Sequence, residues 1–204
     1  MRLATMVLLV PLFLGAASAH AATPPDGGQG RALLFADEFN DGKLDRSKWG
    51  VIGPDFWVNN EQQAYVDSPE TIRFLPAGAV EGADGGVLVL QPHYRKGYRT
   101  PDGRSTDFVS GRLESRGKFE FTHGRASARI RMPDAVGVWP AFWLLPVSGA
   151  WPPEIDVYEG FGNSSDWNFA RDISANLHGG AGGKRRFTVP MRVDAQRVYG
   201  IGGF

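Results

Sequence analysis

The chain has no cysteine among its 204 residues, and its charges cancel, with 22 Lys and Arg against 22 Asp and Glu. The absence of cysteine excludes thiol catalysis, zinc ribbons, iron–sulfur clusters and disulfide scaffolding. A net charge of zero gives no general attraction to a phosphate backbone, so nucleic-acid binding is not expected. The chain is instead rich in turn formers and aromatics, with 27 Gly, 14 Pro, 13 Phe, 6 Trp and 5 Tyr. This composition favours a globular protein with many turns between short elements.

An apolar run at the N-terminus, over residues 3–14, follows a single arginine and precedes small residues that offer cleavage sites. Pro11 and Gly15 interrupt it, and it is shorter than the roughly 18–20 apolar residues of a membrane span. We therefore expect residues 1–21 to be a signal peptide rather than a membrane anchor. Residues 22–32, rich in Pro and Gly, are expected to be a flexible linker. Export predicts a secreted or periplasmic protein with no membrane attachment after signal cleavage.

The remaining residues, 33–204, favour an all-β domain. Short runs of Val, Ile, Phe, Trp and Thr alternate with Gly, Asp, Asn and Pro, and no helical period persists over three turns. Strands are predicted at Val87–Leu90, at 119–121 and at 125–131. In the last of these, alternation places Arg and Ser on one face and Ala and Ile130 on the other, so we expect one polar face and one core face.

Two tryptophans share a face of the segment 138–145. Alternation places Trp139 and Trp143 together, with Phe142 and Leu144 opposite them. Because Phe142 and Leu144 already supply a core face, the tryptophans are candidates for a platform on which sugar rings stack. The alternative is that both belong to the core of a second sheet, since tryptophan is usually well buried.

Three carboxylates follow closely in the sequence. Glu154 and Asp156 share a face of a strand, but Glu159 comes five residues after Glu154, so a regular strand sends it to the other face. A one-residue bulge near Val157 and Tyr158 would bring it back, and bulges occur beside active sites because they re-aim side chains. Three carboxylates on one face repel one another and cost stability, so the pattern indicates a function that uses them.

Hydrolysis of a glycosidic bond is the chemistry that this pattern suits. Two carboxyls flanking the bond act as nucleophile and as general acid/base, with roughly 5 Å between them in a retaining reaction. A third carboxylate between them positions the nucleophile and raises the pKa of the acid by repulsion. Residues four strand positions apart lie roughly 13 Å apart along the backbone, so the strand must curve for the carboxyls to approach.

The segment Glu154–Glu159, EIDVYE, resembles the E-[IL]-D-x-x-E signature of glycoside hydrolase family 16. Three further segments resemble family motifs in the same order: the opening strand at 35–49, the NNE-Q-Y segment at 59–65 and the WPAFW strand at 137–146. The resemblance implies a β-sandwich, a concanavalin-like jelly roll with a concave substrate cleft, over residues 33–204.

The resemblance also implies roles for individual residues. Glu154 is similar to the nucleophile, Asp156 to the assisting carboxylate and Glu159 to the acid/base. Further residues resemble those that contact substrate: Trp139, Trp143, Trp151, Asn59, Glu61, Arg129 and His178. For His178 the alternative is an ordinary strand histidine, and for Asn59 and Glu61 it is turn chemistry.

The chain departs from the family pattern at two places. Ser127 stands where the family usually has Glu, which predicts either weaker binding at a remote subsite or a preference for another sugar there. After Tyr199 the chain ends within a few residues, whereas the family continues with further strands, so we expect the last strands of the sandwich to be missing. An Asp near the family's C-terminus completes its calcium site and has no counterpart here. Whether the chain binds a structural calcium ion is therefore left open, and catalysis by two carboxyls requires no cofactor.

The sequence thus predicts a secreted, endo-acting, retaining glycoside hydrolase that is monomeric. Its partner is a polysaccharide: β-1,3-1,4-linked or β-1,3-linked glucan, or a bacterial exopolysaccharide. Fold and carboxylates alone do not fix the linkage. Two alternatives remain, a non-catalytic carbohydrate-binding jelly roll and an inactive, truncated pseudoenzyme.

Overall fold

The computed structural model describes residues 32–131, 133, 135–161, 172–180 and 187–194. The chain divides into two compact units, 1–36 and 37–204, and the described strands all belong to the second. The predicted signal peptide, 1–21, and all but the last residue of the predicted linker lie outside the described residues. Within the described part of the chain, no helix has the length and apolarity that a membrane crossing needs.

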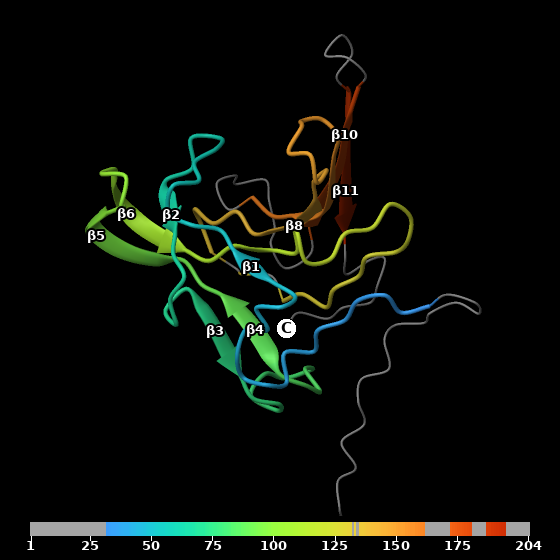
Figure 1. Cartoon of the computed structure of the whole chain (residues 1–204), viewed down its shortest axis with the longest axis horizontal. Helices are drawn as coiled ribbons and strands as arrows, with labels where there is room; N and C mark the ends of the chain where they lie inside the picture. The colour runs from blue at the N-terminus through green and yellow to red at the C-terminus, as the bar shows by residue number, and fades with distance from the viewer. Residues whose placement is uncertain (1–31, 132, 134, 162–171, 181–186, 195–204) are drawn as a thin grey trace, which may run out of the picture. The chain divides into compact units, whose positions relative to one another are not determined.

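The described residues form β-strands and no helix, so the all-β prediction is confirmed. The strands are β1 (Gly50–Val51), β2 (Gln63–Tyr65), β3 (Ile72–Leu75), β4 (Val87–Leu90), β5 (His93–Arg99), β6 (Ser105–Ser110), β7 (Leu113–Glu114), β8 (Ala141–Leu144), β9 (Glu154–Glu159), β10 (Asp172–Gly179) and β11 (Phe187–Asp194). They pair in the orders β11-β10-β9-β8, β2-β6-β5, β1-β7 and β3-β4 (Figure 1). All neighbours are antiparallel except β2 and β6.

Fully buried residues gather where β6 meets β2 and Thr71, the residue before β3. Ala64 of β2 pairs with Val109 of β6, and both are fully buried. At Gly111, just after β6, a Cβ would come within 2.6 Å of the carbonyl oxygen of Thr71, so only glycine fits. This close approach fixes the backbone immediately before Arg112, a residue of the candidate site.

The four-stranded sheet, coloured orange to red in Figure 1, positions the carboxylates. In β8, β9 and β10, paired residues lie on the same side of the sheet, and the two sides carry different kinds of side chain. One side, here called the carboxylate face, carries Ala141, Trp143, Glu154, Asp156, Glu159, Ser174, Asn176 and His178. The other, the apolar face, carries Phe142, Leu144, Ile155, Tyr158 and Leu177.

One of the three strand predictions for the middle of the chain is confirmed and two are wrong. Val87–Leu90 is β4 and pairs with β3. Neither 119–121 nor 125–131 is a strand, and Ile130, expected to face a core, is 42% exposed. Alternation supplies two faces, but a strand also needs a neighbour for its backbone N–H and C=O groups. No described strand pairs with either segment.

Candidate active site

The bulge predicted from the spacing of the carboxylates is present in β9. On the β8 side, Phe142 pairs with Tyr158 but Trp143 pairs with Asp156, so one residue of β9 is extra. The β10 side shows the same shift, because Ser174 pairs with Glu159 and Asn176 with Asp156. The extra residue returns Glu159 to the side of Glu154 and Asp156.

Glu154 opens β9 and is half-buried. The indole Nε1–H of Trp151, three residues earlier, donates a hydrogen bond to Glu154 Oε2. The Trp151 ring also lies 5.8 Å from the His178 ring, centroid to centroid. One carboxylate oxygen of Glu154 is therefore held by an indole from the residues just before β9.

Asp156 lies between the two glutamates and is 3% exposed. Its Oδ2 is 3.0 Å from His178 Nε2 on the neighbouring strand. Burial, together with the charges of Glu159 and Glu154 and a hydrogen bond with Glu154, raises the pKa of Asp156 to about 7, and the contact with His178 opposes this rise. A carboxyl with such a pKa can carry a proton near neutral pH and donate it in a hydrogen bond to Glu154.

Glu159 is buried at the end of β9, and both of its carboxylate oxygens accept hydrogen bonds. Trp139 Nε1 donates to Oε1 at 2.9 Å, and Asn176 Nδ2 donates to Oε2 at 2.5 Å. Asn176 also contacts Ser174 Oγ at 3.2 Å. The two glutamates thus have different hydrogen-bond partners, as two carboxyls with different roles need.

An arginine that the sequence analysis missed lies beside Trp143. The Arg112 guanidinium carbon is 4.6 Å from the Trp143 ring centre, 4.2 Å from that of Phe56 and 5.8 Å from that of Tyr65. Among the described residues, the guanidinium has no hydrogen-bond or ion-pair partner. Its donors are therefore available to oxygen atoms of a ligand, while the rings fix its plane.

Glu61 joins the same group of residues. Its Oε2 accepts hydrogen bonds from Tyr65 Oη at 2.7 Å and from Gln63 Nε2 at 2.6 Å. Burial, followed by the hydrogen bond and charge of Glu61, raises the pKa of Tyr65 to about 12, so the phenol keeps its proton. Glu61 is consequently held by side chains of β2 rather than serving only as a solvated turn residue.

Two predicted contact residues are not brought to the carboxylates. Asn59 is exposed in a turn with a φ of 54°, a left-handed conformation that asparagine tolerates, which fits the turn alternative. Arg129 lies in the segment predicted as a strand, and its exposed Nη1 is 3.8 Å from Asp84 Oδ2. Without a strand at 125–131, nothing in the register directs Arg129 to the sheet.

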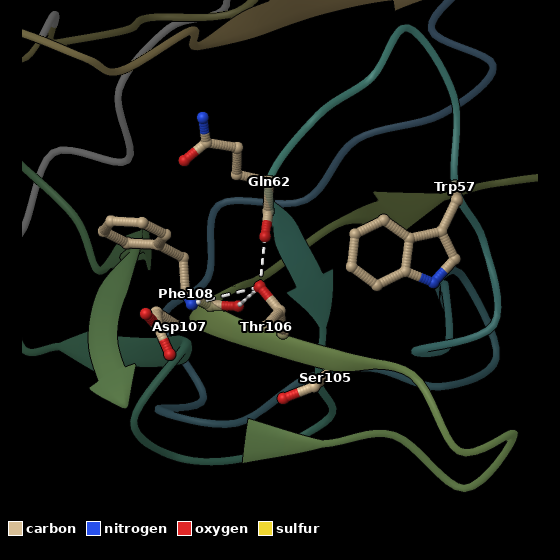
Figure 2. Close-up of a pocket in the computed structure, with 6 residues that line it drawn as sticks. All are labelled: Trp57, Gln62, Ser105, Thr106, Asp107 and Phe108. Atoms are coloured by element: carbon tan, nitrogen blue, oxygen red, sulfur yellow. Dashed lines mark hydrogen bonds between the residues drawn. The ribbon is translucent and has the colours of Figure 1, made fainter. Parts of the chain in front are cut away.

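A separate open hollow of about 420 Å³ lies along β6 and contains none of the predicted site residues. Figure 2 shows its lining: Trp57, Gln62, Ser105, Thr106, Asp107 and Phe108. The Thr106 hydroxyl donates to the Gln62 carbonyl oxygen, and Asp107 Oδ1 accepts from Gly97 N at 2.7 Å. This hollow offers no pair of carboxyls for catalysis, so the candidate site is the carboxylate face.

Glu154, Asp156 and His178 each offer a ligand atom, and these atoms lie within 4.8 Å of one another. Hydrogen bonds to neighbouring side chains already account for this grouping, and glycoside hydrolysis needs no metal. We assign no metal to it.

Comparison with known proteins agrees with this geometry. Residues 83–200 match the family model described as glycosyl hydrolases family 16, which covers more than half of the chain. The chain belongs to glycosyl hydrolase family 16.

Two curated relatives and one solved structure illustrate the match. The chain is 34% identical to an endo-1,3-1,4-beta-glycanase, ExsH, of Rhizobium meliloti, over 74% of this chain and 33% of that protein. It is 30% identical to a beta-1,3-glucan-binding protein of Penaeus monodon, over 76% of this chain and 50% of that protein. A Bacteroides ovatus family 16 structure, described as a mixed-linkage glucan protein with a G4G4G3G product, superposes with a TM-score of 0.56 at 27% identity, over 79% of this chain and 64% of that one.

The predicted jelly-roll class is confirmed by this structural likeness. The chain spans about a third of the length of the Rhizobium relative and half that of the Penaeus relative.

Proposed function

We propose that this protein is an endo-acting glycoside hydrolase that cleaves β-glucan with retention. The observation that carries the proposal is the carboxylate face, on which a bulge aligns Glu159 with Glu154 and Asp156. Glu154 acts as the nucleophile: it attacks the anomeric carbon and forms an ester while the glycosidic C–O bond breaks. Glu159 gives its proton to the leaving oxygen, so the departing sugar leaves with a free hydroxyl.

The second step reverses these roles. Glu159, now ionised, takes a proton from water, whose oxygen attacks the anomeric carbon and breaks the ester to Glu154. Asp156 stays between the glutamates, where its raised pKa lets it donate a hydrogen bond that steadies Glu154. Both glutamates end in their starting states.

The substrate class we propose is β-1,3-1,4-linked or β-1,3-linked glucan, or a related bacterial exopolysaccharide. Two relatives support it by their names, one as an endo-1,3-1,4-beta-glycanase and one as a beta-1,3-glucan-binding protein. Trp143 offers a ring for the C–H face of a sugar, and Arg112 and Glu61 offer a donor and an acceptor for its hydroxyls.

The remaining proposals concern the setting of the reaction. The N-terminal pattern supports export to the periplasm or the medium. We also propose that the chain acts as a monomer and that two carboxyls suffice without a cofactor.

Trapping with a 2-deoxy-2-fluoro β-glycoside of 2,4-dinitrophenol tests this mechanism, because the fluorine slows both ester formation and ester hydrolysis, whereas the good leaving group speeds only the formation, so the ester accumulates. Peptide mass spectrometry should find the sugar on Glu154 in the native chain and no label in Glu154→Gln. A label on Glu159, or glucan turnover without any trapped ester, would contradict the proposed roles.

A second candidate function is glucan binding without cleavage, which the Penaeus relative favours by its name. It predicts that the native chain and Glu154→Gln bind glucan equally and that neither releases reducing ends. The three intact carboxylates favour hydrolysis instead, since a pure binding face gains nothing from their mutual repulsion.

A further inference from the structure

We propose that Asn176 is a positioning residue that selects which oxygen of Glu159 carries the catalytic proton. The inference rests on the proposed function and concerns the same site. Asn176 lies on β10 opposite Asp156, one pair away from the Ser174–Glu159 pair. Because of the bulge, its amide reaches along the sheet to Glu159 rather than to the residue it faces.

The hydrogen bonds on the two oxygens of Glu159 differ in how firmly they are held. Asn176 donates to Oε2 at 2.5 Å from within a strand, and its amide is also 3.2 Å from the hydroxyl of the buried Ser174. Trp139 donates to Oε1 from outside β8 and is 46% exposed, with its ring 5.1 Å from Phe161. A glycan entering from solvent meets the exposed Trp139 first and can displace its N–H from Oε1.

This asymmetry assigns the proton. In a carboxylic acid the carbonyl oxygen is a better hydrogen-bond acceptor than the hydroxyl oxygen, so an N–H donor fixed at Oε2 favours the carbonyl form there, and the acid form of Glu159 carries its proton on Oε1. Oε1 is then the atom that protonates the glycosidic oxygen in the first step and accepts a proton from water in the second. Asn176 thereby sets the direction of proton transfer without touching the reacting atoms.

Comparison of two substrates separates this role from a structural one. Mixed-linkage β-glucan has a poor leaving group and needs the proton, whereas a 2,4-dinitrophenyl β-glycoside forms the ester without it. We expect Asn176→Leu, which keeps the volume but loses the donor, to lower kcat on glucan about 10–100-fold with KM nearly unchanged. The kcat/KM for the dinitrophenyl glycoside should stay within about twofold of the native value.

Two further variants make the test robust. Asn176→Asp keeps the shape but replaces the N–H donor with a carboxylate oxygen that also repels Glu159, so its loss on glucan should be at least as large as that of Asn176→Leu, even where Asn176→Leu melts at a lower temperature. Ser174→Ala keeps the Asn176 N–H donor but removes the hydroxyl that Asn176 also contacts. It should therefore lower kcat on glucan by less than Asn176→Leu does and leave the dinitrophenyl glycoside unaffected.

Equal losses on both substrates, or full glucan activity in Asn176→Leu and Asn176→Asp, would overturn the positioning role while leaving the proposed function intact. A native chain that cleaves neither substrate would overturn the proposed function, and the inference with it.

Discussion

The two faces of the sheet formed by β8, β9 and β10 come from the same three strands, yet their side chains differ in how they are accommodated. On the carboxylate face, each acidic side chain has a hydrogen-bond partner: Trp151 for Glu154, His178 for Asp156, and Trp139 with Asn176 for Glu159. On the apolar face, Tyr158 is buried, but Ile155 and Leu177 remain 45 and 41% exposed.

The difference indicates that the carboxylate face is arranged for function, at a cost in stability, whereas the apolar face has no such role. The carboxylate face concentrates like charge at a cost that its hydrogen bonds reduce. The apolar face offers side chains that stabilise a fold only when covered, so Ile155 and Leu177 contribute little here. Substitutions on the first face should change activity, and those on the second should change solubility.

After Glu154→Gln, which should abolish turnover, the largest effect is expected from Glu159→Ala. Loss of the proposed general acid/base should lower glucan turnover by about 10²–10⁴-fold. Azide, which needs no base, should restore turnover of a 2,4-dinitrophenyl β-glycoside and give a β-glycosyl azide, identified by proton NMR. Failure of azide to rescue, or an α-glycosyl azide, would contradict the assignment of Glu159.

Asp156→Asn should reveal the pH dependence of the carboxylate face. The pKa of Asp156 is raised from 3.8 to about 7 in the folded chain, so the folded state holds a proton that the unfolded state has lost between these values. Stability therefore falls as pH rises through this window.

Asp156→Asn removes that dependence, so the Tm of the variant minus that of the native chain should grow from pH 5 to pH 8 by about 2–4 °C. Calorimetry at both pH values measures it. A difference that stays constant would show that the carboxyl is not perturbed.

Arg112→Ala should weaken substrate binding. The guanidinium offers unused donors beside Trp143, so its loss should raise the KM for glucan about 10-fold, equivalent to roughly 1.4 kcal/mol, with kcat less affected. Arg112→Lys keeps the charge but loses the planar stack, so it should recover only part of the affinity. Native-like KM values in both variants would place Arg112 outside the substrate path.

Leu177→Thr on the apolar face should have the smallest effect on catalysis. Because Leu177 is exposed, its replacement by a β-branched polar residue should leave kcat/KM within about twofold and reduce aggregation. Light scattering and initial rates measure the two quantities side by side. A large loss of activity would show that the faces are coupled.

The sequence predicted the all-β class from its short apolar runs and frequent turn residues. It predicted the bulge in β9 because the carboxylates at positions 154, 156 and 159 can act together only from one side of the strand. It missed Asn176 and Arg112, since neither lies in a distinctive motif and their partners come from distant strands. It misplaced Arg129, because alternation in 125–131 says nothing about whether a neighbouring strand is present.

The central claim is that Glu154 drives endo-cleavage of β-glucan from the carboxylate face. The most direct test follows the viscosity of a mixed-linkage β-glucan solution with equal concentrations of the native chain and of Glu154→Gln. A similar Tm for the two chains shows that the variant is folded. A rapid fall in viscosity with the native chain alone is the predicted result. Equal falls with both chains, or no fall with either, would contradict the claim.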